Sequence, residues 1–285
     1  MKKNESNGTD PIVSSNEAWS RKPVWSILLT IAGFFVALYV GTTPAVMVWG
    51  ADTDSLISRL VAGAGVTIAA IGVVYLLRSH GRQAWSALRL QWRWTIALDV
   101  LVGVMLALLV IVASNIVSVT VGAAEWRSWI SVQPDIALNV LASSFIVILL
   151  VQAFPEELLF RGHLFTTLSE KLSPWSVLLL TSVAFGSIHI LSQSPAEGVG
   201  ERILYVVSST GLGFMLAAGR IAKGTLWLPV GLHLGHNLFQ QIFVTVDDGP
   251  YSVQLIVSTV LMVLAGFIFL YWRSRRDLSK RGSYN

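Results

Sequence analysis

The feature that most constrains this chain is a series of long apolar stretches that contain no charged residue. A helix needs about 20 mainly apolar residues to cross a bilayer, whereas a membrane β-barrel would show short segments of alternating polarity. The sequence therefore predicts an all-α polytopic membrane bundle of about eight transmembrane helices. The five clearest spans are Val24–Ala51, Leu60–Leu77, Val100–Ala124, Ile136–Pro155 and Gly249–Trp272, and three shorter or more polar ones are Leu172–His189, Ile203–Gly219 and Thr225–Val246.

Composition agrees with a membrane protein and excludes several kinds of site. Only 13% of the 285 residues are charged, against about 25% in a soluble domain. The chain has no cysteine, which excludes disulfides, thiolate metal sites and a cysteine nucleophile. We expect a polar, disordered tail at residues 1–22, one transmembrane domain at residues 23–272 and a basic cytoplasmic tail at residues 273–285.

The distribution of basic residues predicts the orientation of the bundle. With eight spans, sixteen of the 20 Lys and Arg residues fall on one side, while Arg59, Arg127 and Arg202 fall on the other and Arg161 lies within a helix. Because basic loops remain in the cytoplasm, both termini are expected to be cytoplasmic. Nucleic-acid binding requires a clustered basic surface on a folded domain, so we expect no nucleic-acid partner. The second side also carries Asp52, Asp54, Asp247 and Asp248.

Three short motifs place ionisable groups inside the apolar stretches, where such groups are costly and by default mark a functional site. The first motif is Glu156-Glu157-x-x-x-Arg161. Residues i and i+4 share one face of an α-helix, so we expect Glu157 to pair with Arg161 and to serve structure. Glu156 points about 100° away and stays free to act as a general base. Gln152 shares the face of Glu156 and is given a supporting role.

The second motif, Phe185-x-x-x-His189, follows a turn that ends at Pro174. Glu156 lies about 15 residues before this turn and His189 about 17 after it, so antiparallel helices would bring both to a similar depth. The helix that carries Glu156 must then continue to about Ser169. We interpret His189 as a partner of Glu156 in water activation, and Phe185 as either a wall of the site or an ordinary packing residue.

The third motif, His233-x-x-x-Asn237, again has its two polar residues on one helical face. Both side chains can donate hydrogen bonds, which makes them a candidate oxyanion hole. Gly231 and Gly235 flank His233 and would allow a second helix to approach closely. His236 lies about 60° round the helix from His233; it is either the rival of His233 or a supporting residue.

The same residues leave two mechanisms open. Glu156, His189 and His233 are side chains that Zn²⁺ takes as ligands. However, they come from three helices, and the chain lacks the His-Glu-x-x-His pattern that pre-forms a chelate on one helix. Without a metal, Glu156 and His189 would activate a water, while His233 and Asn237 would hold the oxyanion.

These three motifs, in this order and on late transmembrane helices, resemble those of the CPBP family, the CAAX protease and bacteriocin-processing enzymes that are also called the Abi family. The similarity extends over Ile136–Phe243. It implies an eight-helix intramembrane endopeptidase, either a metalloprotease or a glutamate-dependent enzyme, whose site is reached from the cytoplasm. The implied substrate is a membrane-associated peptide of the CAAX-like or bacteriocin-like kind. We expect a multi-pass integral protein of a bacterial or archaeal plasma membrane.

These residues are compatible with two functions. The complete set of base, water-activating histidine and oxyanion donors favours an intramembrane peptidase. The alternative is a non-enzymatic membrane scaffold, immunity factor or carrier with the same fold, in which the buried ionisable residues would be structural or proton-conducting. A secondary transporter would show internal repeats or pairs of broken helices, and no repeat stands out.

Overall fold

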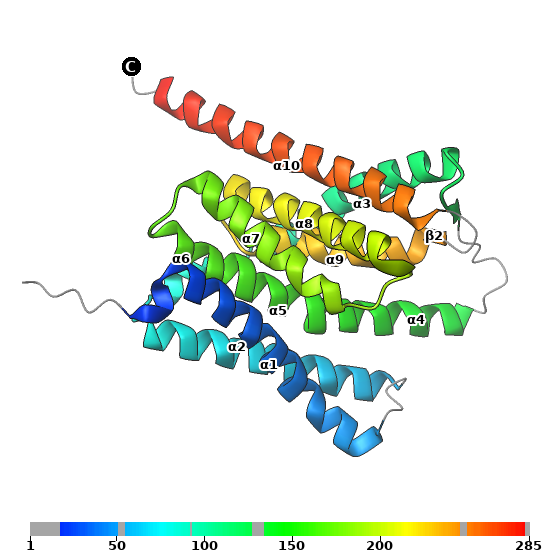
Figure 1. Ribbon diagram of the computed structural model, residues 1–285, viewed down its shortest axis with the longest axis horizontal. Coiled ribbons are helices and arrows are strands. Elements are labelled where there is room, and N and C mark those ends of the chain that lie inside the picture. The colour runs from blue at the N-terminus through cyan, green and yellow to red at the C-terminus, as the bar shows by residue number, and fades with distance from the viewer. Residues whose placement is uncertain (1–17, 51–54, 92, 127–133, 246–249, 283–285) are drawn as a thin grey trace, which may run out of the picture.

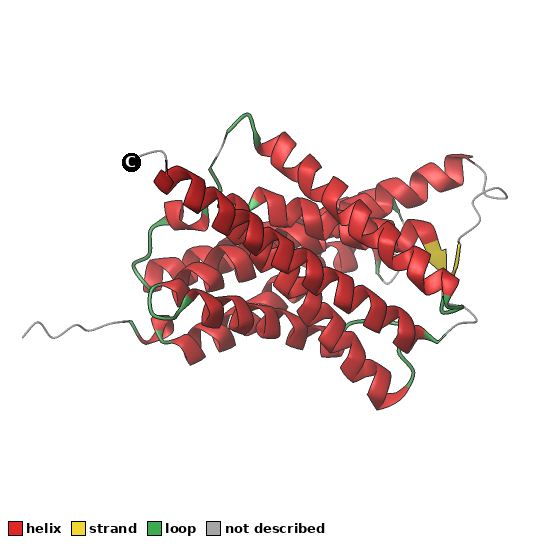
Figure 2. Cartoon of the chain, turned by 90° about the horizontal axis from the view of Figure 1, so that it is seen from above, coloured by secondary structure: helices red, strands yellow, loops and turns green. Residues whose placement is uncertain are grey.

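The computed structural model describes residues 18–50, 55–91, 93–126, 134–245 and 250–282. Within these residues the chain is a bundle of helices (Figure 1), and Figure 2 shows that two short strands at one end are its only extended segments. The predicted all-α polytopic fold is confirmed. Residues 1–17 of the expected N-terminal tail lie outside the described residues, as do Arg127, Asp52, Asp54, Asp247 and Asp248 from the orientation argument.

The first half of the chain begins with a short 3₁₀ turn and then forms long helices. Its elements are η1 (Trp19–Arg21), α1 (Pro23–Trp49), α2 (Leu56–His80), η2 (Trp85–Leu88), α3 (Ile96–Thr120) and strand β1 (Glu125–Trp126).

The second half contains the three motifs. Its elements are α4 (Pro134–Val147), η3 (Ile148–Ala153), α5 (Phe154–Glu157), η4 (Leu158–Leu164), α6 (Phe165–Ser169), α7 (Pro174–Ile188), η5 (His189–Leu191), α8 (Gly198–Lys223), α9 (Trp227–Phe243), strand β2 (Val244–Thr245) and α10 (Tyr251–Gly282). Since α10 continues to Gly282, residues 273–282 of the expected basic tail are helical.

Seven helices of the described chain are long and apolar enough to cross a membrane. They correspond to seven of the eight predicted spans. The eighth, Thr225–Val246, corresponds to α9, whose 17 residues make it one residue shorter than the shortest of the seven, Pro174–Leu191. The predicted extension of the first-motif helix is also confirmed, because this span runs from Leu138 to Ser169.

The bundle is built from closely packed helix pairs: α1 lies along α2, α3 along α9, and α8 between α7 and α10. The predicted close approach at Gly231 and Gly235 is confirmed. A Cβ on Gly231 would collide with the carbonyl oxygen of Val100, and one on Gly235 would lie 2.9 Å from the Cβ of Ala107. Thus α9 runs alongside α3 in the same direction, and strands β1 and β2, which pair antiparallel, join the ends of these two helices.

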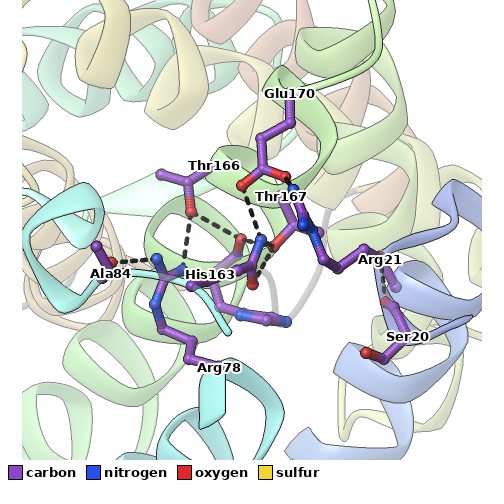
Figure 3. A network of polar contacts seen from close by, with 10 residues as sticks. Ser20, Arg21, Arg78, Ala84, His163, Thr166, Thr167 and Glu170 are labelled. Atoms are coloured by element: carbon purple, nitrogen blue, oxygen red, sulfur yellow. Dashed lines mark hydrogen bonds and ion pairs between the residues drawn. The ribbon is translucent and has the colours of Figure 1, made fainter. Parts of the chain in front are cut away.

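A polar network fastens α1 and α2 to the end of α6 (Figure 3). Arg78 is 1% exposed; it donates to Thr166 at 3.2 Å and to the carbonyl of Ala84. Gln83 donates to Glu170 at 2.9 Å, and Glu170 also pairs with Arg21, which precedes α1. The helix that carries the first motif is therefore held at this end by Arg78 of α2 and by two side chains that flank α1 and α2, those of Arg21 and Gln83.

Candidate active site

The first motif lies on a part of its helix that is not regularly α-helical. Glu156 and Glu157 belong to α5, which stands between the two π-helical segments η3 and η4. Pro155 has no N–H to donate to the preceding turn, and single π-helical turns are frequent at functional sites. Both carboxylates are inside the protein, since Glu156 is 5% exposed and Glu157 is fully buried.

Glu157 and Arg161 form the predicted buried ion pair. Nη1 of Arg161 donates to Oε1 of Glu157 at 2.8 Å, and both side chains are fully buried. Nη2 of Arg161 donates to the carbonyl oxygen of Gly213 in α8 at 2.9 Å. The guanidinium carbon lies 4.2 Å from the ring centre of Phe185, so this one side chain ties the first motif to α8 and to α7.

His233 lies between the two carboxylates of the first motif. Its Nδ1 is 3.0 Å from Oε1 of Glu157, and its Nε2 is 4.0 Å from Oε2 of Glu156. Because an ionised carboxylate only accepts hydrogen bonds, Nδ1 carries a hydrogen and donates it to Glu157. Nε2 therefore faces Glu156 across a gap that is too long for a direct hydrogen bond and suits one bridging water.

His189, the half-buried cap of α7, has its ring fixed in a similar way. Its Nδ1 donates to the carbonyl oxygen of Phe185 at 2.9 Å, which leaves Nε2 available. The fully buried ring of Phe185 contacts both histidine rings, with centroids 4.8 Å from His189 and 5.6 Å from His233. Phe185 thus packs between the two histidines. Tyr205 of α8 lies on another side of His189, with ring centroids 6.1 Å apart.

Asn237 contacts the helix of the first motif through Gln152. Nδ2 of Asn237 donates to Oε1 of Gln152 at 2.9 Å, and both residues are half-buried. His236 lies within electrostatic range of His233 and His189. Its Nδ1 is buried and finds no partner in the described part of the chain, so His236 adjoins the site without contacting the carboxylates.

The four predicted catalytic side chains are gathered around His233. Glu156 and His189 each interact electrostatically with His233, and Asn237 is one turn further along α9. The arrangement holds an unpartnered buried carboxylate oxygen, two imidazole Nε2 atoms and a carboxamide, which together can move a proton and donate hydrogen bonds. The catalytic roles themselves stay a prediction.

Glu156, His189 and His233 are suitable zinc ligands by chemical type. Yet no three His, Asp or Glu side chains among the described residues are close enough together to hold one ion. This arrangement does not fit a three-ligand metal centre, so no catalytic step is derived through a metal.

Sequence analysis missed three contacts that shape the site. The bond between Glu157 and His233 joins residues 76 positions apart, the carbonyl of Gly213 holds Arg161, and Tyr205 adjoins His189. Each of these contacts joins two helices. A single motif does not specify how two helices are rotated about their axes relative to each other. The only signal in the sequence was the polar character of Tyr205 within an apolar span.

Comparison with known proteins finds a family to which this part of the chain is similar. No curated protein matches the chain. Residues 138–239 match the family model described as type II CAAX prenyl endopeptidase Rce1-like. This segment contains all three motifs and nearly coincides with the predicted core, Ile136–Phe243. The match supports the predicted resemblance of this segment to the CAAX proteases of the CPBP family.

Proposed function

We propose that this protein is an intramembrane endopeptidase that hydrolyses a peptide bond of a membrane-associated peptide of the CAAX-like or bacteriocin-like kind. The observation that supports it best is the pair of adjacent buried carboxylates in unequal surroundings. Oε1 of Glu157 accepts hydrogen bonds from Arg161 and from His233, whereas Glu156 approaches Nε2 of His233 only at 4.0 Å, through its Oε2. The Oε2 atoms of both carboxylates are buried without a hydrogen-bond partner in the described part of the chain. Such asymmetry suits one structural carboxylate and one general base.

In the first step Glu156 takes a proton from a water molecule as the water oxygen attacks the scissile carbonyl carbon. The free Nε2 of His189 accepts a hydrogen bond from the second O–H of that water and so orients it, and this hydrogen stays on the attacking oxygen. The carbonyl π-electrons move to oxygen, which forms a tetrahedral oxyanion. Asn237 donates an N–H to this oxyanion.

His233 is the second proposed donor to the oxyanion. Its Nδ1 hydrogen is already donated to Glu157, so a proton on Nε2 makes the ring an imidazolium that donates from both nitrogens. Glu157, at 3.0 Å, stabilises that positive charge. In the second step the oxyanion collapses, the C–N bond breaks, and Glu156 returns its proton to the leaving amine.

The test is peptide cleavage by purified protein in bilayer discs, with and without Glu156→Gln. This change keeps size and hydrogen bonding but removes the base, so turnover should fall by at least about 10²-fold. Glu170→Gln is the matched control, because Glu170 lies in the network at the end of α6, away from the site. If Glu156→Gln cleaves as fast as Glu170→Gln, a scaffold, immunity factor or carrier becomes the better explanation.

A chelator separates the two mechanisms. Turnover should be unchanged by 1,10-phenanthroline, because the proposed steps use only side chains and water. Loss of activity that added Zn²⁺ restores would instead assign Glu156, His189 and His233 as zinc ligands.

A further inference from the structure

Two hydrogen bonds join the first-motif helix to α9, and their spacing differs on the two helices. Oε1 of Gln152 accepts from Asn237 at 2.9 Å, and Oε1 of Glu157 lies 3.0 Å from Nδ1 of His233. The acceptors are five residues apart on their helix. The donors are four residues apart on α9.

Regular α-helices would not allow this match. A spacing of four residues returns to nearly the same face, but five residues end about 140° away. The π-helical segment η3 changes this spacing, because π-helical hydrogen bonds join residues five apart. Here the N–H of Phe154 donates to the carbonyl of Leu149. The wider turn carries Gln152 round to the face that Glu157 presents to α9.

The π-helical segment is also fastened on its far side. Oγ1 of Thr67 in α2 donates to the carbonyl oxygen of Leu150 at 2.7 Å. Gly63, one turn earlier on α2, lets Leu150 approach so closely that a Cβ there would lie 2.8 Å from the Cβ of Leu150. The position of Gln152 is therefore set by the fold and does not depend on its contact with Asn237.

The contact decides how the carboxamide of Asn237 points. A carboxamide has two N–H donors and one carbonyl acceptor, and its terminal torsion has broad, roughly two-fold preferences. When Gln152 accepts one N–H, the amide plane is fixed and the second N–H is directed away from Gln152. An oxyanion donor works only when it is already aimed at the developing charge.

From this geometry we infer that Gln152 is a positioning residue, which orients the Asn237 carboxamide as an oxyanion donor. The π-helical segment η3 makes this contact possible, because it turns Gln152 towards α9. The inference rests on the proposed peptidase function and adds a residue to it. Gln152 itself need not touch the substrate.

The experiment compares Gln152→Leu, Gln152→Glu and the control Thr43→Val in the cleavage assay. Gln152→Leu removes the acceptor and should lower kcat by about 10- to 10²-fold, the scale of a misplaced catalytic group, with KM nearly unchanged. Gln152→Glu keeps an acceptor oxygen at the same place and should recover most of kcat. Thr43→Val, which removes a side-chain hydrogen bond to the carbonyl oxygen of Tyr39 in α1, should leave kcat within about twofold, since this bond lies outside both the site and the π-helical segment.

A double-mutant cycle on thermal stability tests the contact between Gln152 and Asn237 without an activity assay. Gln152→Leu and Asn237→Leu should each lower the melting temperature, and the double variant should melt no lower than the weaker single variant, because both changes remove one bond. Additive shifts would overturn the inference even in an inactive preparation. If the wild type cleaves, Glu156→Gln does not, and Gln152→Leu is as active as Thr43→Val, this inference fails while the peptidase stands. If the wild type cleaves no peptide, both fail.

Discussion

A single carboxylate oxygen, Oε1 of Glu157, accepts hydrogen bonds from Arg161 and from His233. The bond to Arg161 could be predicted from the sequence, because the i,i+4 spacing alone brings the two side chains together. The bond to His233 could not, because it depends on how α9 is rotated against a distant helix. Glu157 therefore has a structural role and also fixes the ring of His233.

Two i,i+4 ion pairs in the described part of the chain, one buried and one exposed, allow a direct comparison of the effect of burial. Arg161→Ala should lower the free energy of unfolding by about 3–5 kcal/mol, because it leaves the buried Glu157 unpaired. Arg273 and Asp277 form the matched exposed pair, where Arg273→Ala should cost less than about 1 kcal/mol. Thermal unfolding in detergent measures both. Equal shifts would show that the Glu157–Arg161 pair is solvated.

The neighbouring histidines of α9 should differ sharply in function. His233→Ala removes the ring between both carboxylates and should reduce turnover by at least about 10²-fold. His236→Ala should retain activity within about tenfold, because His236 contacts neither carboxylate and lies only in electrostatic range. Peptide cleavage by the two folded variants measures this. The reverse ranking would make His236 the catalytic residue.

At the scale of elements, the π-helical segments η3 and η4 are what the sequence did not reveal. The four-residue spacings within the three motifs correctly predicted residues one helical turn apart. The extension of the first-motif helix to Ser169 was predicted from the position of the turn that ends at Pro174. Nothing in the residues 148–164 specifies a wider turn except Pro155, and a proline in a helix also permits a simple kink. Gln152 and Glu157 are five residues apart, yet they bind two donors on α9 that are only four residues apart. This arrangement could therefore not be predicted from the sequence.

The close contact of α3 with α9 should be sensitive to one methyl group. Gly231→Ala places a Cβ against the backbone of Val100, and overpacking of this kind costs about 1–3 kcal/mol. Turnover should fall as well, because a displaced α9 moves His233. Gly72→Ala in α2 is the matched control, since nothing lies within 4 Å of the new Cβ. A Gly231→Ala protein as stable and active as Gly72→Ala would contradict this packing.

For the whole molecule, hydropathy was sufficient to place the spans, because a bilayer demands long apolar helices wherever the chain crosses it. The order in which those helices pack was not predictable, since apolar side chains suit lipid and protein neighbours alike. The small residues Gly231 and Gly235 were the exception, and they marked one interface correctly. The orientation of the bundle stays a prediction from its basic residues.

The orientation of the bundle can be measured by labelling single introduced cysteines, because the sequence contains none. Ser274→Cys near the C-terminus should react with a membrane-impermeant maleimide only in inside-out vesicles. Gln193→Cys, in the connection between α7 and α8, should react only in right-side-out vesicles. Both positions are exposed. The opposite pattern would invert the topology and move the C-terminus out of the cytoplasm.

The lengths of the helices that carry the histidines also bear on the surrounding lipid. At 1.5 Å per residue, the 18 residues of the span Pro174–Leu191 and the 17 of α9 rise only about 27 and 26 Å, less than the usual hydrocarbon thickness of about 30 Å. A span that is too short draws the two leaflets together. The bilayer should therefore be thinner beside His189 than beside the 27 residues of α1, and turnover should be faster in short-chain than in long-chain phosphatidylcholine.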